Sequence, residues 1–300
     1  MPRPGMLVAS ARIVFSLSSA PFTAASGAMP VGEIQLSCFT GPWGPDGLIH
    51  SMHAVHAANF DGIECPAEVI RRFEDRLPVF EEILEHDNLR LSGIHQPLNF
   101  FAAEQADELV ERAANAARFL RAAGRGYLLA VPVDAVDAPL TDEQWATACA
   151  ILDEAGERCR ELDIDFCFVP SARSFGAAER EIKRLLVTTK AENVFLCVDT
   201  AELALAGVDP AKIIKTHSAR LRAVRLREAS GAKRRPGAAF PPPPAFGRGI
   251  VKFDAVAKAL LDMRYSGWVS VDVTGESGDP AKAAENGYRH IFRRSGLFAL

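Results

Sequence analysis

The chain has 300 residues, of which 48% are hydrophobic and 24% charged, and this suits one large α/β domain or two small ones. The net charge of −4 gives no basic field, so nucleic acid is not an expected partner. No apolar run is long enough to span a bilayer. The six cysteines form no CxxC pair, and Cys65, Cys167 and Cys197 lie in strand-like runs. We therefore expect reduced, buried thiols in a cytoplasmic protein.

Residues 1–29 differ from the rest and are left out of the fold. They contain Arg3 and Arg12, many alanines and serines, and no acidic residue precedes Glu33. A transit peptide has such a composition, whereas Arg12 interrupts the apolar core that a secretory signal needs. The third interpretation, a true start at Met29, is favoured because the first expected strand begins a few residues later.

Short β-rich runs alternate with amphipathic stretches along the chain. Several runs, such as VFLCVD and YLLAVPV, are continuously apolar, which is typical of strands buried on both faces of a parallel sheet. The expected strands are residues 33–38, 62–65, 90–95, 127–133, 163–169, 194–199, 221–226 and 268–273.

Helices are expected between these strands at residues 103–123, 141–161, 176–188 and 253–264. In the second of them, Thr141 precedes two acidic residues and is a plausible helix start. Eight strand–helix units predict a single (β/α)8 TIM barrel over residues 30–300. A doubly wound open sheet is the alternative, but SCFTGPWGPDG lacks the G-x-G-x-x-G spacing.

The segment 229–249, ASGAKRRPGAAFPPPPAFGRG, interrupts this rhythm. It is too rich in proline and glycine for a helix, so we expect a long loop after the seventh strand. In a barrel it would lie at the mouth, as a lid or as a disordered insert. A basic patch at residues 233–235 could meet an anionic substrate, although such residues are more often merely solvated.

Three stretches carry a family resemblance. They are NFDGIECP at 59–66, VFLCVDTAELALAGVDP with the following RLRAVRLRE within 194–228, and GRGIVKFDAVAKALLDMRYSGWVSVDV at 247–273. In order and spacing these resemble the xylose isomerase-like superfamily, especially its inosose dehydratase and sugar phosphate isomerase/epimerase branch. The resemblance extends over roughly residues 33–295 and implies a TIM barrel.

The resemblance also implies one divalent ion, Mn²⁺, Co²⁺ or Mg²⁺, held by carboxylates and a histidine at strand ends. Asp199 matches an expected metal ligand, and Asp272 corresponds to the carboxylate of the last strand, so these two are the metal candidates if an ion is retained. Arg225, however, stands where the histidine is expected, and Val169-Pro170-Ser171 supplies no ligand. The expectation is therefore either no cofactor or a single divalent metal.

An arginine at position 225 would repel a cation. It would instead pair with Asp199 or Asp272 and act as a fixed positive charge in place of the ion. Asp199 ends an apolar strand, where an unpaired buried carboxylate would be costly. Two interpretations of Glu202 are equally favoured: an acid/base role, or a solvent-exposed position in the first turn of a helix. For His95, at the end of a strand, a functional role and a structural role are about equally favoured.

The candidate site residues fall into two sets. The expected catalytic residues are Asp199, Arg225, Asp272, Glu202 and His95. The expected substrate-binding residues are Trp43, Glu64, Gln96, Arg227 and Glu228. Trp43 could form an apolar wall for a sugar ring or plug the barrel. Arg227 keeps a positive charge but cannot act as a base. By contrast, His50, His53 and His56 recur every third residue on the first helix, a spacing that suggests a metal site, but that helix lies outside the barrel and an exposed face is the favoured interpretation.

Two function hypotheses follow. The first is an isomerase, epimerase or dehydratase that removes a proton next to the carbonyl of a sugar, cyclitol or related polyhydroxylated compound, with or without a metal. The second is a non-catalytic barrel that binds a small ligand or a partner protein. An endonuclease of the same superfamily is disfavoured, since the chain has seven histidines, three of them on the first helix. Barrels of this kind are often dimers or tetramers, so a homo-oligomer is a further expectation.

Overall fold

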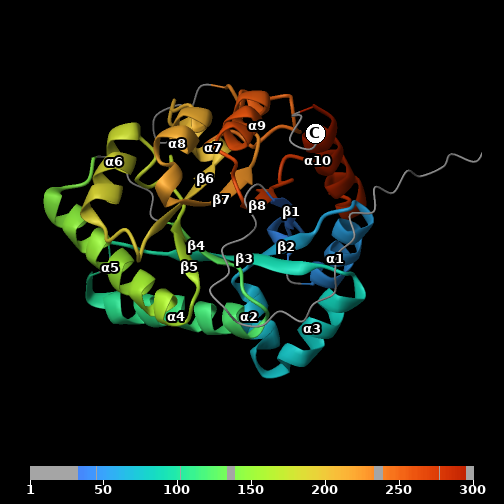
Figure 1. Cartoon of the computed structure of the whole chain (residues 1–300), viewed down its shortest axis with the longest axis horizontal. Coiled ribbons are helices and arrows are strands. Elements are labelled where there is room, and N and C mark those ends of the chain that lie inside the picture. Colours follow the sequence, from blue (N-terminus) through green and yellow to red (C-terminus); the bar gives the residue numbers. More distant parts are fainter. Residues whose placement is uncertain are drawn as a thin grey trace, which may run out of the picture.

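The computed structural model describes residues 33–44, 46–101, 103–133, 139–232, 239–276 and 278–294. In these residues eight parallel strands close in chain order into one barrel, with helices around them (Figure 1). The strands are β1 (Ile34–Phe39), β2 (Gly62–Pro66), β3 (Arg90–Leu98), β4 (Tyr127–Pro132), β5 (Asp165–Phe168), β6 (Phe195–Asp199), β7 (Leu221–Leu226) and β8 (Gly267–Val271). The predicted (β/α)8 TIM barrel is confirmed, and each expected strand is present with its ends shifted by at most three residues.

The helices lie in chain order between the strands. They are α1 (Leu48–Ala57), α2 (Glu68–Phe73), α3 (Leu77–His86), α4 (Ala106–Ala122), α5 (Asp142–Glu161), α6 (Glu179–Thr188), α7 (Thr200–Leu205), α8 (Pro210–Thr216), α9 (Phe253–Asp262) and α10 (Pro280–Arg294), with single 3₁₀ turns η1 (Gly41–Trp43), η2 (Glu74–Arg76), η3 (Ala103–Gln105) and η4 (Ser218–Arg220). None of the described helices is long and apolar enough to cross a membrane.

Two apolar regions follow from the alternation of side chains along each strand. The larger lies between the barrel and its helices and takes residues such as Ile63, Leu128 and Val224. The smaller fills the inside of the barrel with Leu129, Cys167, Val169, Cys197 and Ala223. The six cysteines all lie in the described residues and are free and buried, as expected.

Helix α5 begins as its sequence predicts. The Thr141 hydroxyl accepts a hydrogen bond from the Gln144 amide, and the Gln144 side chain accepts one from the Thr141 amide. Such a capping box satisfies two backbone donors that the helix itself leaves free.

Removing this cap should cost stability. We expect Thr141→Ala to lower the free energy of unfolding by about 1 kcal/mol, because the Gln144 amide loses its acceptor. Urea denaturation measures the change. Thr141→Ser keeps the hydroxyl and should stay within a few tenths of a kcal/mol of the parent protein; an equal loss in both variants would contradict the capping explanation.

The described part of the segment 229–249 is held at its C-terminal end. Both carboxylate oxygens of Glu228 are used: Oε1 accepts from the amides of Ala229 and Val251, and Oε2 accepts from that of Gly247. Gly249 lies so close to this carboxylate that an added Cβ would be 2.4 Å from Glu228 Oε1. A glycine is therefore required where the chain passes over Glu228.

The other end of this part reaches further across the barrel. The guanidinium of Arg173, in the loop after β5, lies 5.5 Å from the ring of Phe240. The amide of Phe246 donates to Glu276, which follows β8. These contacts tie the loop to two other loops at the C-terminal ends of the strands. The predicted N-terminal extension at 1–29 and the basic patch at 233–235 lie outside the described residues.

Candidate active site at the barrel mouth

Two arginines and four carboxylates meet at the C-terminal end of the barrel. Arg225 comes from β7, and its guanidinium touches carboxylates from three other strands. Its Nε is 3.0 Å from Glu64 Oε1 of β2, its Nη1 is 3.5 Å from Asp199 Oδ2 of β6, and its Nη2 is 3.1 Å from Asp272 Oδ2, directly after β8. The expected pairing of Arg225 with Asp199 or Asp272 therefore occurs with both.

All four of these side chains are removed from solvent, with exposed fractions of 1–4%. The strand register explains why they meet, because Asp199 is the direct neighbour of Arg225 on the adjacent strand and Ser270, two residues before Asp272, is its neighbour on the other side. Burial alone would lower the pKa of Arg225, yet the three carboxylates together raise it. The guanidinium is thus held as a permanent cation at the centre of the mouth.

Arg227 forms the outer part of the same cluster and is 18% exposed. Its Nη2 lies 2.6 Å from Glu202 Oε1 and 3.2 Å from Asp199 Oδ2. Its backbone is fixed as well, because its amide donates to the Thr200 hydroxyl, which in turn donates to the Arg227 carbonyl. Arg227 is therefore the guanidinium that solvent, and hence a ligand, can reach.

Three of the carboxylates accept hydrogen bonds from backbone amides. Asp199 Oδ1 caps α7 by accepting from the amides of Ala201 and Glu202. Asp272 Oδ1 accepts from the amide and the hydroxyl of Thr274. Glu202 Oε2 accepts from the amide of Ala172 at 2.8 Å. These hydrogen bonds fix the positions of the three carboxylates.

In the described residues Glu64, unlike these three carboxylates, accepts no hydrogen bond from a backbone amide. Its Oε1 is close to Arg225 Nε but, like Asp199 Oδ2, receives no hydrogen bond of good geometry. Burial is the main influence on this group, and it outweighs the opposing charge of Arg225, so the pKa of Glu64 rises from 4.5 to about 6. A carboxyl group with such a pKa exchanges protons readily near neutral pH.

His95 lies two residues beyond Gly93, the direct neighbour of Glu64, and thus nearer the rim of the mouth. Its ring is 5.2 Å from that of Phe39, over which the Arg225 guanidinium is also placed. Burial, together with the charges of Arg225 and then Arg227, lowers the pKa of His95 well below its usual value. The imidazole is therefore neutral and can donate one hydrogen bond and accept another.

The structure brings six of the ten predicted site residues into direct contact through ion pairs: Glu64, Asp199, Glu202, Arg225, Arg227 and Asp272. Gln96 follows His95 on β3, so its side chain alternates to the other face, and it donates to the Pro97 carbonyl. Trp43 packs against the apolar core from η1.

Both carboxylate oxygens of Glu228 accept from amides of the loop after β7, so this residue holds the loop rather than joining the ion-pair cluster. Sequence reasoning assigned Glu64 to substrate binding and missed its contact with Arg225. Only the position of Glu64 at the end of an apolar strand pointed to the mouth.

The mouth does not fit a divalent metal ion. Metal sites of the kind implied by the sequence need several oxygen or nitrogen ligands directed at one point. Here that point is taken by the Arg225 guanidinium, which contacts three of the carboxylates. Within the described residues, the one group of three ligand atoms close enough to share an ion is His53, His86 and Asp87, which is on α1 and α3 rather than at the mouth.

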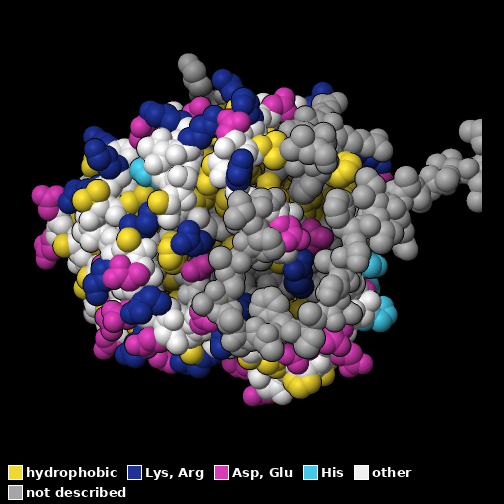
Figure 2. Space-filling view, in the orientation of Figure 1, with side chains coloured by type: hydrophobic (Ala, Val, Ile, Leu, Met, Phe, Trp, Pro, Cys, Tyr) yellow, Lys and Arg dark blue, Asp and Glu magenta, His cyan; other side chains and the backbone are white. Residues whose placement is uncertain are grey.

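Acidic and basic side chains are mixed over the face seen in Figure 2, without a large area of one sign. The cluster itself has four carboxylates against two guanidiniums. A mouth with no excess of positive charge favours a neutral ligand over a phosphorylated one.

Comparison with known proteins agrees with this architecture. An inosose dehydratase of Lacticaseibacillus casei is 26% identical over 159 residues, a match that covers 48% of this chain and only 50% of that protein. An inosose dehydratase of Bacillus cereus is 24% identical over 267 residues, covering 80% of this chain and 87% of that protein.

Solved structures resemble the fold at low sequence identity. The IolI protein, solved with a bound zinc atom, has a TM-score of 0.73 at 15% identity and covers 89% of this chain and all of that one (100%). D-Allulose 3-epimerase from Methylomonas sp. has a TM-score of 0.70 at 17% identity, covering 89% of this chain and 99% of that one.

The family model described as xylose isomerase-like TIM barrel matches residues 52–294, which is most of the chain. With its closed eight-stranded barrel and its sugar epimerase and dehydratase relatives, this protein belongs to the xylose isomerase-like TIM barrel family.

Proposed function

We propose that this protein is an enzyme that acts on a neutral polyhydroxylated carbonyl compound, a sugar or cyclitol, by removing a proton next to the carbonyl without a metal ion. The observation that carries the proposal is the Arg225 guanidinium, buried among carboxylates from three other strands. The inosose dehydratase and sugar epimerase relatives support the substrate class.

Proton abstraction next to a carbonyl leaves negative charge on the carbonyl oxygen, which the site must stabilise. Arg227 is exposed enough to donate to that oxygen, and Arg225 adds a second positive charge behind it. His95, kept neutral, can donate a hydrogen bond to a neighbouring substrate oxygen. No such donor needs to reorganise during the reaction, because the carboxylates already hold both guanidiniums in place.

Glu64 is the proposed base, and because its side chain is 2% exposed, this role requires that substrate binding open the mouth to its carboxylate. Its pKa of about 6 leaves it largely ionised at neutral pH yet able to take a proton. Asp199, Asp272 and Glu202, which the sequence offers for this role, are each held by backbone or hydroxyl donors and by arginine. Returning the proton to the neighbouring carbon of the enediol gives isomerisation, whereas epimerisation needs a second acid that delivers a proton to the opposite face of the same carbon. Loss of a β-hydroxyl as water gives dehydration.

A binding barrel without catalysis is the second candidate. It is favoured by one observation, namely that each of the three nitrogens of Arg225 already faces a carboxylate and the residue is 3% exposed. Such a closed cluster would form the rigid bottom surface of a ligand-binding site. The two candidates differ in whether the α-proton of a bound compound exchanges with solvent.

Exchange in D₂O tests both candidates without knowledge of the product. The protein is incubated with a panel of ketoses and inososes, and loss of the α-proton signal is followed by NMR with and without EDTA. We expect exchange that EDTA leaves unchanged and that Arg227→Met slows about 100-fold or more, because a donor to the developing oxyanion is lost.

The matched control is Arg158→Met, an exposed arginine on α5 that pairs with Glu161, and it should leave the exchange rate unchanged. Compounds that bind without exchange would favour the binding barrel. Exchange that EDTA abolishes would refute the metal-independent mechanism.

A further inference from the structure

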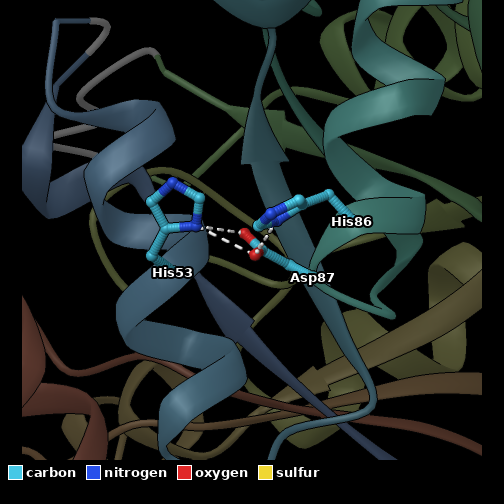
Figure 3. A group of neighbouring side chains, drawn as sticks. All are labelled: His53, His86 and Asp87. Atoms are coloured by element: carbon cyan, nitrogen blue, oxygen red, sulfur yellow. Dashed lines mark hydrogen bonds and ion pairs between the residues drawn. The ribbon is translucent and has the colours of Figure 1, made fainter.

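A second group of potential ligands lies outside the barrel, between α1 and α3. Figure 3 shows His53 of α1 and His86 of α3 pointing toward the carboxylate of Asp87. The Nδ1 atom of His53 is 2.6 Å from Asp87 Oδ2, and Nδ1 of His86 is 2.9 Å from Oδ1. One ligand atom from each of the three residues falls within 4.8 Å of the others.

The local backbone explains why these groups converge. His86 is the last residue of α3, and Asp87 follows as its C-cap. Asn88 then adopts a left-handed conformation with φ 49°, which turns the chain toward β3. The C-terminal end of a helix has a negative partial charge from its free carbonyl groups, and it therefore favours a nearby cation.

The three side chains of this group differ in exposure and in charge. The side chain of Asp87 is 4% exposed, whereas those of His53 and His86 are 50% and 74% exposed. Burial alone would raise the pKa of Asp87, but hydrogen bonds from His86 and His53 outweigh burial and lower it, so the group stays ionised. Its Oδ2 nevertheless lacks a hydrogen bond of good geometry.

In the described residues the ion-pair partners of Asp87 are these two imidazoles, and no lysine or arginine pairs with it. A carboxylate that is 4% exposed favours a permanent positive charge beside it, and in the described residues neither lysine nor arginine supplies one. A divalent cation would supply such a charge, with one atom from each of the three residues as its ligand.

We propose that His53, His86 and Asp87 bind a first-row divalent transition-metal ion of the Zn²⁺ type. Two imidazoles and a carboxylate are a common ligand set for zinc, with water at the fourth position. Tetrahedral bonds of the usual length separate ligand atoms by about 3.3 Å. The nitrogen–oxygen distances from His53 and His86 to Asp87 are somewhat shorter, at 2.6 and 2.9 Å. The two imidazoles are exposed and can move apart by that amount.

Such a site would link α1 to α3 and would be separate from the mouth. His86 precedes the first residue of β3, Arg90, whereas Arg225 and its partners lie at the C-terminal ends of the strands. An ion at this position would therefore stabilise the fold without entering the chemistry at the mouth.

The experiment uses the full chain without a polyhistidine tag, stripped with chelator and then titrated with Zn²⁺ by calorimetry. We expect one equivalent bound per chain, a rise in Tm with Zn²⁺, and weaker binding at acidic pH, where protons compete with the ion for the ligands. Co²⁺ in place of Zn²⁺ should give the visible absorption of a four-coordinate ion.

His53→Ala and His86→Ala each remove one exposed ligand, and each should weaken Zn²⁺ binding at least tenfold, by analogy with the loss seen when even supporting residues are removed. The matched controls are His50→Ala and His56→Ala, exposed histidines on the same helix, which should bind as the parent does. One equivalent retained at parental affinity in His53→Ala and His86→Ala, or no binding by the parent protein, would overturn the proposal.

Discussion

Arg225→Ala is expected to lower the free energy of unfolding by about 3–5 kcal/mol, because it leaves buried carboxylates without their cation. Glu64, Asp199 and Asp272 are each at most 4% exposed and face the guanidinium at 3.0–3.5 Å. Their desolvation would no longer be offset. Denaturation with urea at pH 7 measures the loss.

The comparison variant is Arg118→Ala, whose arginine pairs with Glu111 on the surface, where both side chains are at least half exposed. That substitution should cost no more than about 1 kcal/mol. The deficit of Arg225→Ala should also shrink as the pH falls, since protonated carboxyl groups need no cation. If Arg225→Ala lowered the free energy of unfolding by less than about 1 kcal/mol at pH 7, the negative charge of the buried carboxylates would have to be balanced by another group.

Glu64→Gln is expected to slow exchange of the substrate α-proton by about 10²–10⁴-fold, because the amide cannot accept the proton. In the parent protein the base is active when ionised, so kcat/KM should rise with pH up to about 6 and then level off. The variant should lose this rise. Glu82→Gln, an exposed position on α3, is the control and should keep both the rate and the profile.

Glu64 should also affect stability in a way that needs no substrate. Its pKa is higher in the folded protein, about 6, than the ordinary 4.5, so its contribution is fully present below pH 4.5 and is lost as the pH rises through 6. The size of this change is about 2 kcal/mol. Glu64→Gln should remove that change, so its stability relative to the parent should improve from pH 4 to pH 7. A pH-independent difference would contradict the raised pKa.

The order of the elements could be predicted because it depends on local patterns. Continuous apolar runs such as residues 194–199 are long enough for one buried strand, and the intervening stretches have helical periodicity. Thr141 marked the start of α5 correctly because its capping box involves residues three apart. These are properties of neighbouring residues and survive without knowledge of the rest of the chain.

The candidate site could be predicted only in part. Asp199, Arg225 and Asp272 were grouped from the sequence because they stand at the positions where the resemblance implies metal ligands near strand ends. Glu64 and Arg225 are 161 positions apart, and their contact depends on closure of the barrel. Gln96 and His95 are neighbours in sequence, yet the twofold alternation of β3 sends them to opposite faces. Glu228 follows Arg225 by three residues, yet both of its carboxylate oxygens accept hydrogen bonds from the loop after β7.

The amino-acid sequence by itself determined the barrel, the absence of the expected histidine at position 225, and the presence of acidic residues at several strand ends. Tertiary structure alone decided which acids the arginine meets, which of them stays short of donors, and that His53 meets His86 and Asp87. The physical reason is that ionisation and metal affinity depend on burial and on atoms a few ångströms away. Those atoms come from strands and helices that only the folded chain brings together.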